Sequence, residues 1–147
     1  MKKLLTLIIF LIVCACGETK YITGPRSAVK LAQGSSSKHT CAILDNWGVS
    51  CWGLNDEGQL GDGSTQSSRT PINNITLPES RKAIAISAGA YHTCAILDNR
   101  GVSCWGWNHY GQLGDGSAED RSTPIDNINL PENRKAIAIS AGESHTC

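Results

Sequence analysis

Residues 39–64 read HTCAILDNWGVSCWGLNDEGQLGDGS, and residues 92–117 read HTCAILDNRGVSCWGWNHYGQLGDGS. The likeness extends beyond these stretches, because residues 39–94 align with residues 92–147 without a gap, at an offset of 53 and with 14 differences in 56 positions. A period near 50 residues is typical of a protein built from stacked structural repeats. We therefore expect one unit at 39–91, a second at 92–144 and a third that stops in mid-unit at Cys147.

Each unit contains four short segments with strand character. The first segment, 82–87, alternates Ala and Ile and reappears as 135–140. The second and third segments, 92–97 and 101–105, flank an Asp-Asn-x-Gly turn. The fourth segment, 123–128, contains a proline. Alternating apolar residues predict strands, the turn predicts a hairpin, and the proline favours an edge strand. The sequence thus predicts an all-β fold, in which residues 30–32 are a degenerate copy of the first strand.

The cysteines follow the same period. Of the seven cysteines, two pairs lie ten residues apart, namely Cys41 with Cys51 and Cys94 with Cys104. The predicted hairpin places the members of a pair opposite each other, with Cβ atoms ~4.5–5.5 Å apart, which suits a disulfide. The alternative is zinc held by His39 and the first cysteine pair, although zinc modules usually have shorter cysteine spacing. Cys147 lies one period after the second pair begins, and we expect it to be unpaired because the sequence stops there.

The N-terminus has the character of an export signal. Lys2 and Lys3 precede the run Leu4–Val13, which is apolar except for one threonine and too short to span a bilayer. Ala15 then precedes Cys16, which resembles the cleavage and lipidation site of a bacterial lipoprotein. We expect a signal peptide at 1–15, a lipidated Cys16 and a membrane-proximal tether at 16–38. The alternative is an ordinary signal peptide cut near Ala15 that leaves a soluble secreted protein.

The predicted location is the bacterial cell envelope. No aspartate follows Cys16 directly, which favours the outer membrane over the inner one. Export also favours disulfides over metal ligation for the paired cysteines. The formal net charge is zero, so the basic footprint of a nucleic-acid-binding protein is missing.

The sequence offers no catalytic, cofactor or metal motif. Nucleophile elbows, phosphate-binding loops and His-Glu-x-x-His are missing. The repeated histidines are expected to be structural, bonding neighbouring loops, and these are His39, His92 and His145.

The positions that differ between the units cluster in loops, at 54, 56, 57, 65–69, 90 and 91 and their copies. A constant frame with changeable loops is how repeat scaffolds usually carry recognition. Trp107, His109 and Tyr110 are therefore the candidate recognition residues, since aromatic side chains are favoured interface anchors. Neutral drift after duplication is the alternative explanation of these differences.

The repeated unit resembles the regulator of chromosome condensation repeat family over residues 39–147. The resemblance rests on the pattern His-Thr-Cys-Ala-Ile-Leu-Asp-Asn-x-Gly-Val-Ser-Cys-Trp-Gly-x-Asn-x-x-Gly-Gln-Leu-Gly-Asp-Gly. The resemblance implies a β-propeller, typically with seven blades of four antiparallel strands. Seven units of this length need roughly 370 residues, so this chain is expected to supply two blades and a stub of an incomplete propeller. The cysteine pairs resemble a bacterial exported branch of the family.

The resemblance implies a non-enzymatic function. Family members serve as exchange factors for small GTPases, as inhibitors of secreted enzymes and as interaction platforms. We expect a lipid-anchored protein-interaction scaffold that contacts the membrane through its N-terminal lipid, binds an unidentified protein and binds no nucleic acid. The alternatives are an envelope enzyme or enzyme subunit whose catalytic part lies outside this chain, and a gene fragment without a function.

Overall fold

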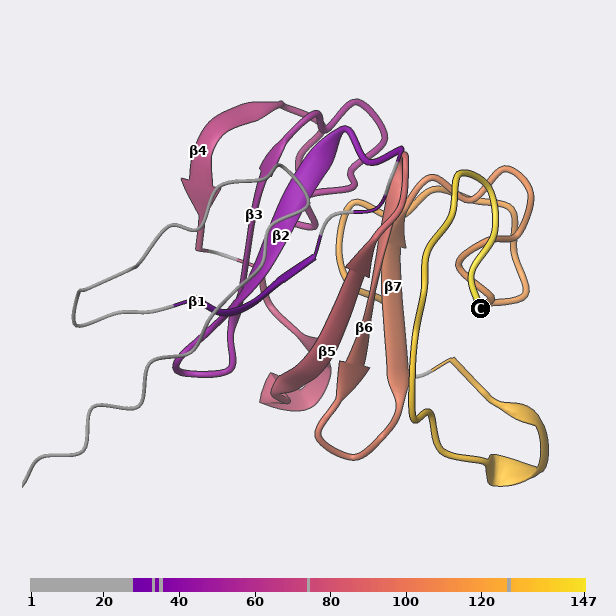
Figure 1. Cartoon of the computed structure of the whole chain (residues 1–147). Helices are drawn as coiled ribbons and strands as arrows, with labels where there is room; N and C mark the ends of the chain where they lie inside the picture. Colours follow the sequence, from indigo (N-terminus) through magenta and orange to yellow (C-terminus); the bar gives the residue numbers. More distant parts are fainter. Residues whose placement is uncertain (1–27, 33, 35, 74, 127) are drawn as a thin grey trace, which may run out of the picture.

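The described residues of the computed structural model are 28–147 except 33, 35, 74 and 127. They form two antiparallel sheets that lie side by side (Figure 1). The first blade has the strand order β1 (Ala28–Ala32), β2 (His39–Leu44), β3 (Val49–Gly53) and β4 (Ser68–Ile72). The second blade has the order β5 (Ala83–Ala88), β6 (His92–Leu97) and β7 (Val102–Gly106). The all-β prediction is therefore confirmed.

Two single 3-10 turns are the only helical elements in the part of the chain that the structure describes. They are η1 (Pro78–Ser80) and η2 (Pro131–Asn133), and they occupy equivalent positions in the two units. Each begins with proline, whose fixed φ suits the first turn of a helix. They lie where the chain turns from the outer edge of one unit back to the start of the next.

The central hairpins place the paired cysteines opposite each other. Cys41 is in register with Cys51, and Cys94 with Cys104, and each pair forms a disulfide with its Cα atoms 4.1 Å apart. In both hairpins the turn contains one non-glycine residue in the left-handed region, Trp47 in the first and the corresponding arginine in the second. The cysteine spacing thus follows from the hairpin register.

The main hydrophobic core lies between the blades. Leu60 comes from the loop after β3 and is fully buried, as is Trp105 on β7 of the second blade. Gly61 is held against this indole so closely that a Cβ on it would lie 2.6 Å from Trp105 Nε1. The indole and the leucine side chain thus belong to one core that both units share.

Strand β1 lies within the segment 16–38 that the sequence assigns to a tether. It pairs with β2 from Ala28↔Leu44 to Ala32↔Cys41, so it is the first strand of the first blade. The expected tether is therefore too long at its C-terminal end, and residues 30–32 are the degenerate strand that the repeat pattern predicts. The signal peptide at 1–15 and Cys16 lie outside the described residues.

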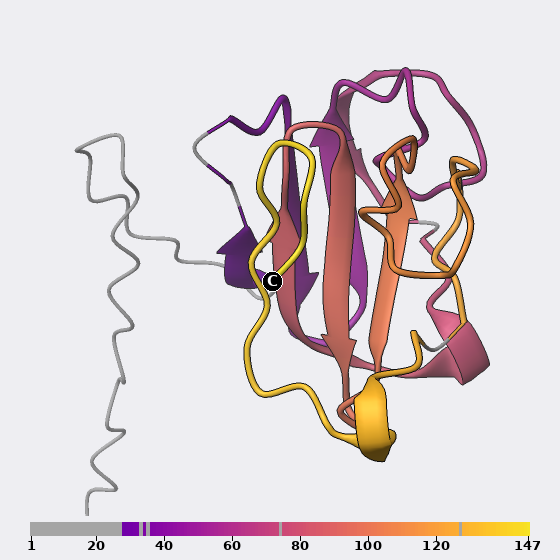
Figure 2. The same cartoon turned by 90° about the vertical axis from the view of Figure 1, so that its right-hand side faces the viewer.

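Two predicted strands of the second unit do not form. Residues 123–128 are not a strand, although Ile125 donates to Cys104 O at 3.1 Å and Ile128 forms an isolated bridge with Val102. Residues 135–139 run alongside the second blade without strand pairing (Figure 2). In the preceding unit the equivalent residues pair with 95–97, and the matching positions would be 148–150, which this sequence does not contain. Residues 135–139 make one backbone hydrogen bond to the described blade, from Ala136 N–H to Arg100 O at 3.0 Å, and a strand needs a continuous row of such bonds.

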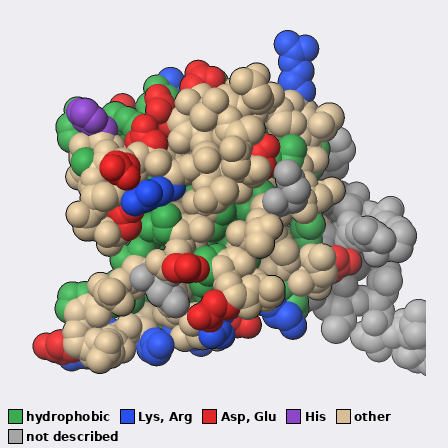
Figure 3. Space-filling model, turned by 180° about the vertical axis from the view of Figure 1, so that it is seen from behind, with side chains coloured by type: hydrophobic (Ala, Val, Ile, Leu, Met, Phe, Trp, Pro, Cys, Tyr) green, Lys and Arg blue, Asp and Glu red, His purple; other side chains and the backbone are tan. Residues whose placement is uncertain are grey.

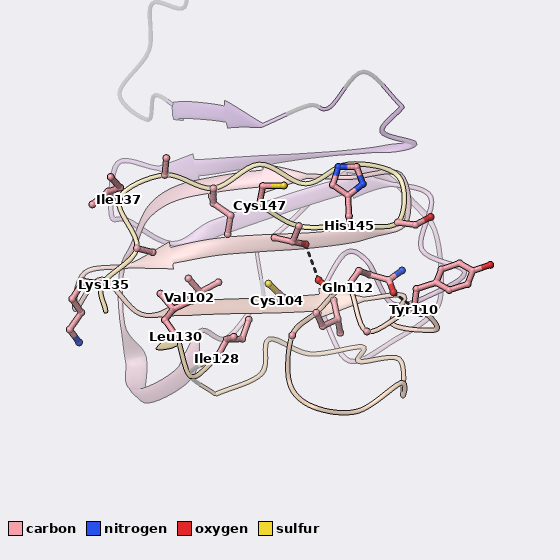
Figure 4. Close-up of a pocket in the computed structure, with 18 residues that line it drawn as sticks. Val102, Cys104, Tyr110, Gln112, Ile128, Leu130, Lys135, Ile137, His145 and Cys147 are labelled. Carbon is pink, nitrogen blue, oxygen red and sulfur yellow. Dashed lines mark hydrogen bonds between the residues drawn. The ribbon is translucent and has the colours of Figure 1, made fainter. Parts of the chain in front are cut away.

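The last residues form a small hairpin against β5. Ala141 bridges Thr146, and Gly142 O accepts the backbone N–H of Ala90 at 3.2 Å. Between this hairpin and β7 lies an apolar groove of about 570 Å³, with Val102, Ile128 and Leu130 among its lining residues (Figure 4). Cys147 is an exposed free thiol at the edge of this groove.

Candidate functional site

A histidine at the start of the second strand of each unit connects one blade to the next. Nε2 of His39 lies 2.6 Å from the hydroxyl of Thr93, and this hydroxyl donates to the backbone oxygen of Gln59 at 2.8 Å. Because the threonine proton is used in that bond, the neutral ring must donate from Nε2. His92 repeats the arrangement with Thr146 at 2.9 Å. The structural role expected for these two inter-blade histidines is confirmed, and the partner of each is the threonine one repeat further along, on β6 for His39 and in the C-terminal hairpin for His92.

Both inter-blade histidines are neutral at ordinary pH. Burial, followed by the charge of His92, lowers the pKa of His39 to about 4. Burial, followed by the charge of His145, lowers the pKa of His92 to about 4. Their Nδ1 atoms are buried and have no hydrogen-bond partner among the described residues. A second ring proton would therefore be a buried donor without an acceptor, which is costly.

A buried asparagine fixes the loop after the third strand of each unit. Oδ1 of Asn55 accepts the N–H of Leu60 at 2.8 Å, and its Nδ2 donates to the carbonyl of Ser64 at 3.1 Å. Asp62 caps the following turn by accepting the N–H of Ser64 at 3.0 Å. Asn108 makes the equivalent bonds in the second unit, at 2.9 and 3.2 Å. The sequence analysis missed the asparagine, although its presence in both copies was the signal that could have found it.

Four aromatic side chains lie together at one end of the second blade. Tyr91 precedes β6 and Trp107 follows β7, and their ring centroids are 5.7 Å apart. The Trp107 centroid also lies 6.3 Å from that of His109 and 5.3 Å from that of Tyr110. The histidine stacks parallel to the indole, and the two tyrosines meet it edge to face. We call these four residues the aromatic patch.

The aromatic patch is open to solvent. His109 and Tyr110 are exposed, the tyrosine to 69%, and Trp107 is half-buried. Figure 4 shows Tyr110 at one end of the apolar groove, pointing away from it. The three residues that the sequence singles out for recognition are thus brought together, and their role in recognition stays a prediction. Tyr91 joins them from a position that also differs between the units, but the sequence analysis did not single it out.

Lys38 extends the patch toward the first blade. Its Nζ lies 4.5 Å from the centroid of the Tyr91 ring and also donates to the Tyr91 hydroxyl. That hydrogen bond, together with the charges of Glu143 and Asp56, raises the pKa of Lys38. The ammonium group thus lies at the hydroxyl end of the Tyr91 ring, where the hydrogen bond holds it. Lys38 occupies the same position in the repeat as Tyr91, 53 residues earlier, and no motif pointed to it.

Carboxylates flank the aromatic patch. Asp120 accepts the N–H of Asn108, the residue after Trp107, at 2.6 Å. The loops that hold these carboxylates are in contact, since a Cβ on Gly58 would lie 2.6 Å from the Cα of Ser122. Burial, followed by the charges of Asp120 and Asp56, raises the pKa of Glu57. We call Asp56, Glu57 and Asp120 the acidic rim. Figure 3 shows acidic, hydrophobic and histidine side chains next to one another at its upper left.

The described residues offer little for metal chemistry or for crossing a membrane. They contain no cluster of three histidine, cysteine or acidic side chains placed to hold a metal ion. The zinc alternative would need the thiolates of Cys41 and Cys51, which are joined to each other. Within the same range, no helix has the length and apolar character needed to span a bilayer.

The repeat pattern and the blades agree with a known family. The model of the regulator of chromosome condensation (RCC1) repeat matches residues 48–96 and 101–147, and a second model of this repeat matches residues 83–112. The chain therefore belongs to the RCC1 repeat family.

Curated relatives include two much longer proteins. The chain is 34% identical over 117 residues to the ultraviolet-B receptor UVR8 of Arabidopsis thaliana, covering 80% of this chain and 26% of the relative. It is 32% identical over 108 residues to the probable E3 ubiquitin-protein ligase HERC3 of Homo sapiens, covering 74% of this chain and 10% of the relative. The chain thus spans about a quarter or less of the length of these relatives.

Solved structures show the same fold. Human WBSCR16 superposes with a TM-score of 0.69 at 20% identity, over 88% of this chain and 32% of the other. Prp20p of Saccharomyces cerevisiae also gives a TM-score of 0.69, at 17% identity and with the same two shares. The two sheets are therefore blades of an RCC1-like β-propeller, and the described part of the chain holds an incomplete one.

Proposed function

We propose that the chain is part of a non-enzymatic scaffold that binds a protein partner through the aromatic patch. The proposal rests on one observation: side chains at positions that differ between the units lie in contact with one another. Residues 91, 107, 109 and 110 differ from their counterparts in the neighbouring unit, and their side chains form one exposed cluster. The asparagine that holds the loop, Asn108, makes the same hydrogen bonds as Asn55 in the first unit. The backbone of the loop is therefore held in the same way in both units, and the exposed side chains differ between them.

The chemistry of the patch suits a protein interface. Tryptophan and tyrosine are enriched among the residues that contribute most to protein binding, because they bring large contact areas at low entropic cost. Among solved relatives, Prp20p is described with binding properties to Gsp1p and histones. A scaffold that binds proteins is therefore consistent with the family.

A cross-linking experiment tests this proposal. A Tyr110→p-benzoylphenylalanine variant is expressed in the native cell and irradiated, and covalent adducts are analysed by mass spectrometry. The matched control carries the same probe at Trp47, which is 41% exposed and lies at the opposite end of β2. We expect a specific protein adduct from position 110 and none from position 47. Equal adducts from both positions, or none from position 110, would overturn the proposal.

We further propose that the protein is exported and held at the bacterial cell envelope, in the outer membrane, by a lipid on Cys16. The support is the basic, apolar and Ala15-Cys16 order of the N-terminus, together with disulfides that persist in oxidising compartments. Mass spectrometry of the N-terminal peptide should find acyl chains on Cys16. A Cys16→Ser variant should lose membrane association, whereas Cys14→Ser should keep it. Unchanged fractionation of Cys16→Ser would refute the anchor.

A further inference from the structure

The aromatic patch has ring surface that no described residue covers. Tyr110 is 69% exposed, and its ring stands edge to face with both Trp107 and His109. A ring with this much exposed surface presents part of its π-face to solvent, where the electrostatic potential is negative. Such a face attracts a cation within about 6 Å of the ring centroid.

The molecule already holds one ammonium group at this patch. Lys38 Nζ lies 4.5 Å from the Tyr91 centroid, at the side of the patch that faces the first blade. This lysine is exposed, and its hydrogen bond to the tyrosine hydroxyl holds it at that end of the ring. The patch therefore accommodates an ammonium group at one of its rings, while Trp107 and Tyr110 have no cation over them among the described residues.

The charge next to the open rings is negative and largely unbalanced. Asp120 is bound to the backbone directly after Trp107, and it lies close enough to Glu57 to raise the pKa of that carboxyl. The nearest arginine in the chain, Arg121, is engaged with Asp115 at 3.0 Å and with a glutamate at 3.6 Å. Lys38 acts on Asp56 and on Glu143, and no described salt bridge joins a cation to Glu57 or Asp120.

We infer that the aromatic patch and the acidic rim together bind an arginine or lysine side chain of the protein partner, within a basic segment of that partner. This inference rests on the proposed function and names the chemistry of the partner. The aliphatic stem and the cationic group would lie on Trp107 and Tyr110, and the carboxylates of Glu57 and Asp120 would accept its hydrogen bonds. Charged hydrogen bonds of this kind are among the stronger polar contacts in proteins.

The test uses two Gly-Ser peptides that differ at one central position, which is arginine in one and citrulline in the other. Each is titrated into the mature protein, and binding is followed by the NMR shift of the Trp107 indole N–H, assigned with a Trp107→Phe variant. We expect the arginine peptide to bind about twofold to fivefold more tightly, as cation–π energies at exposed sites imply. We also expect this preference to vanish in the Glu57→Gln/Asp120→Asn variant, in which the asparagine oxygen can still accept from Asn108.

Asp45→Asn is the matched control, because Asp45 is an exposed carboxylate in the hairpin at the far end of β2. The control should keep the preference for arginine. Equal binding of the two peptides, or an unchanged preference in the doubly neutralised variant, overturns the inference. If the cross-link at position 110 still forms in that case, the proposed function stands without it; if the cross-link is also lost, both fail.

Discussion

Removing the hydroxyl of Thr93 should weaken the joint between the two blades. This hydroxyl is fully buried, accepts from His39 Nε2 at 2.6 Å and donates to the Gln59 oxygen at 2.8 Å. Thr93→Val keeps the shape of the side chain but replaces the hydroxyl with a methyl group. It therefore leaves one buried donor and one buried acceptor without this partner.

The magnitude follows from these two groups. A buried polar group that loses its partner costs about 1–3 kcal/mol. The His39 ring has no compensating bond, because its Nδ1 is also unpaired among the described residues. Two such losses sum to about 2–6 kcal/mol, and we expect the lower part of this range, about 2–4 kcal/mol, because single substitutions seldom cost more than about 4–5 kcal/mol.

The assay is equilibrium urea unfolding followed by tryptophan fluorescence, since buried Trp105 reports on the inter-blade core. The matched control is Thr40→Val at the equivalent position of β2, where the hydroxyl has no hydrogen bond to another described side chain and the residue is only half-buried. The control should change the free energy of unfolding by less than about 0.5 kcal/mol. A His39→Leu/Thr93→Val cycle should give a coupling of at least about 1 kcal/mol. Equal effects of the two threonine variants, or zero coupling, would refute the reasoning.

Three further predictions concern stability, each measured as a free energy of unfolding in urea. The inter-blade histidines have pKa values of about 4 in the folded state, against an ordinary value of 6.5. The unfolded chain therefore binds protons first as the pH falls, and the free energy of unfolding should decrease from about pH 6.5 to pH 4, by about 2 kcal/mol per histidine at pH 4.5. A free energy of unfolding that does not change over this range would contradict the prediction. Gly61→Ala should cost about 1–3 kcal/mol more than Gly114→Ala, because both have positive φ but a Cβ would meet neighbours at 2.6 Å in the first case and 3.4 Å in the second; similar costs would argue against the close packing. Replacing Cys94 and Cys104 by alanine should cost about 3 kcal/mol by releasing the closed loop, whereas Cys147→Ala should have no effect; equal effects would exclude a cross-link.

Much of the fold could be read from the repeat itself. The hairpin register that sets Cys94 opposite Cys104 follows from a local turn, and local turns are encoded by neighbouring residues. The inter-unit role of Leu60 was also predictable, because a leucine held in both units after a glycine-rich loop must pack somewhere. The strand at 135–140 was predicted from the same pattern and does not form, because strand pairing depends on a partner and not on propensity alone.

The candidate site was predictable only in part. The loop residues Trp107, His109 and Tyr110 stand out because they differ from their counterparts in the first unit. Tyr91 and Lys38 could not be assigned to the same surface, since they lie 16 and 69 residues before Trp107. The pairing of β6 with β7 and the packing of the two blades bring them there.

The sequence by itself determined the period, the strand-rich blades, the cysteine pairs and the histidines that both units share. These features are local, or they repeat, and the same residues at the same spacing make the same short-range contacts in each unit. The tertiary structure alone decided which residues of different units meet. Lys38, which precedes the second strand of the first blade, donates a hydrogen bond to the hydroxyl of Tyr91 next to the second blade, because blade packing joins positions that are far apart in the chain.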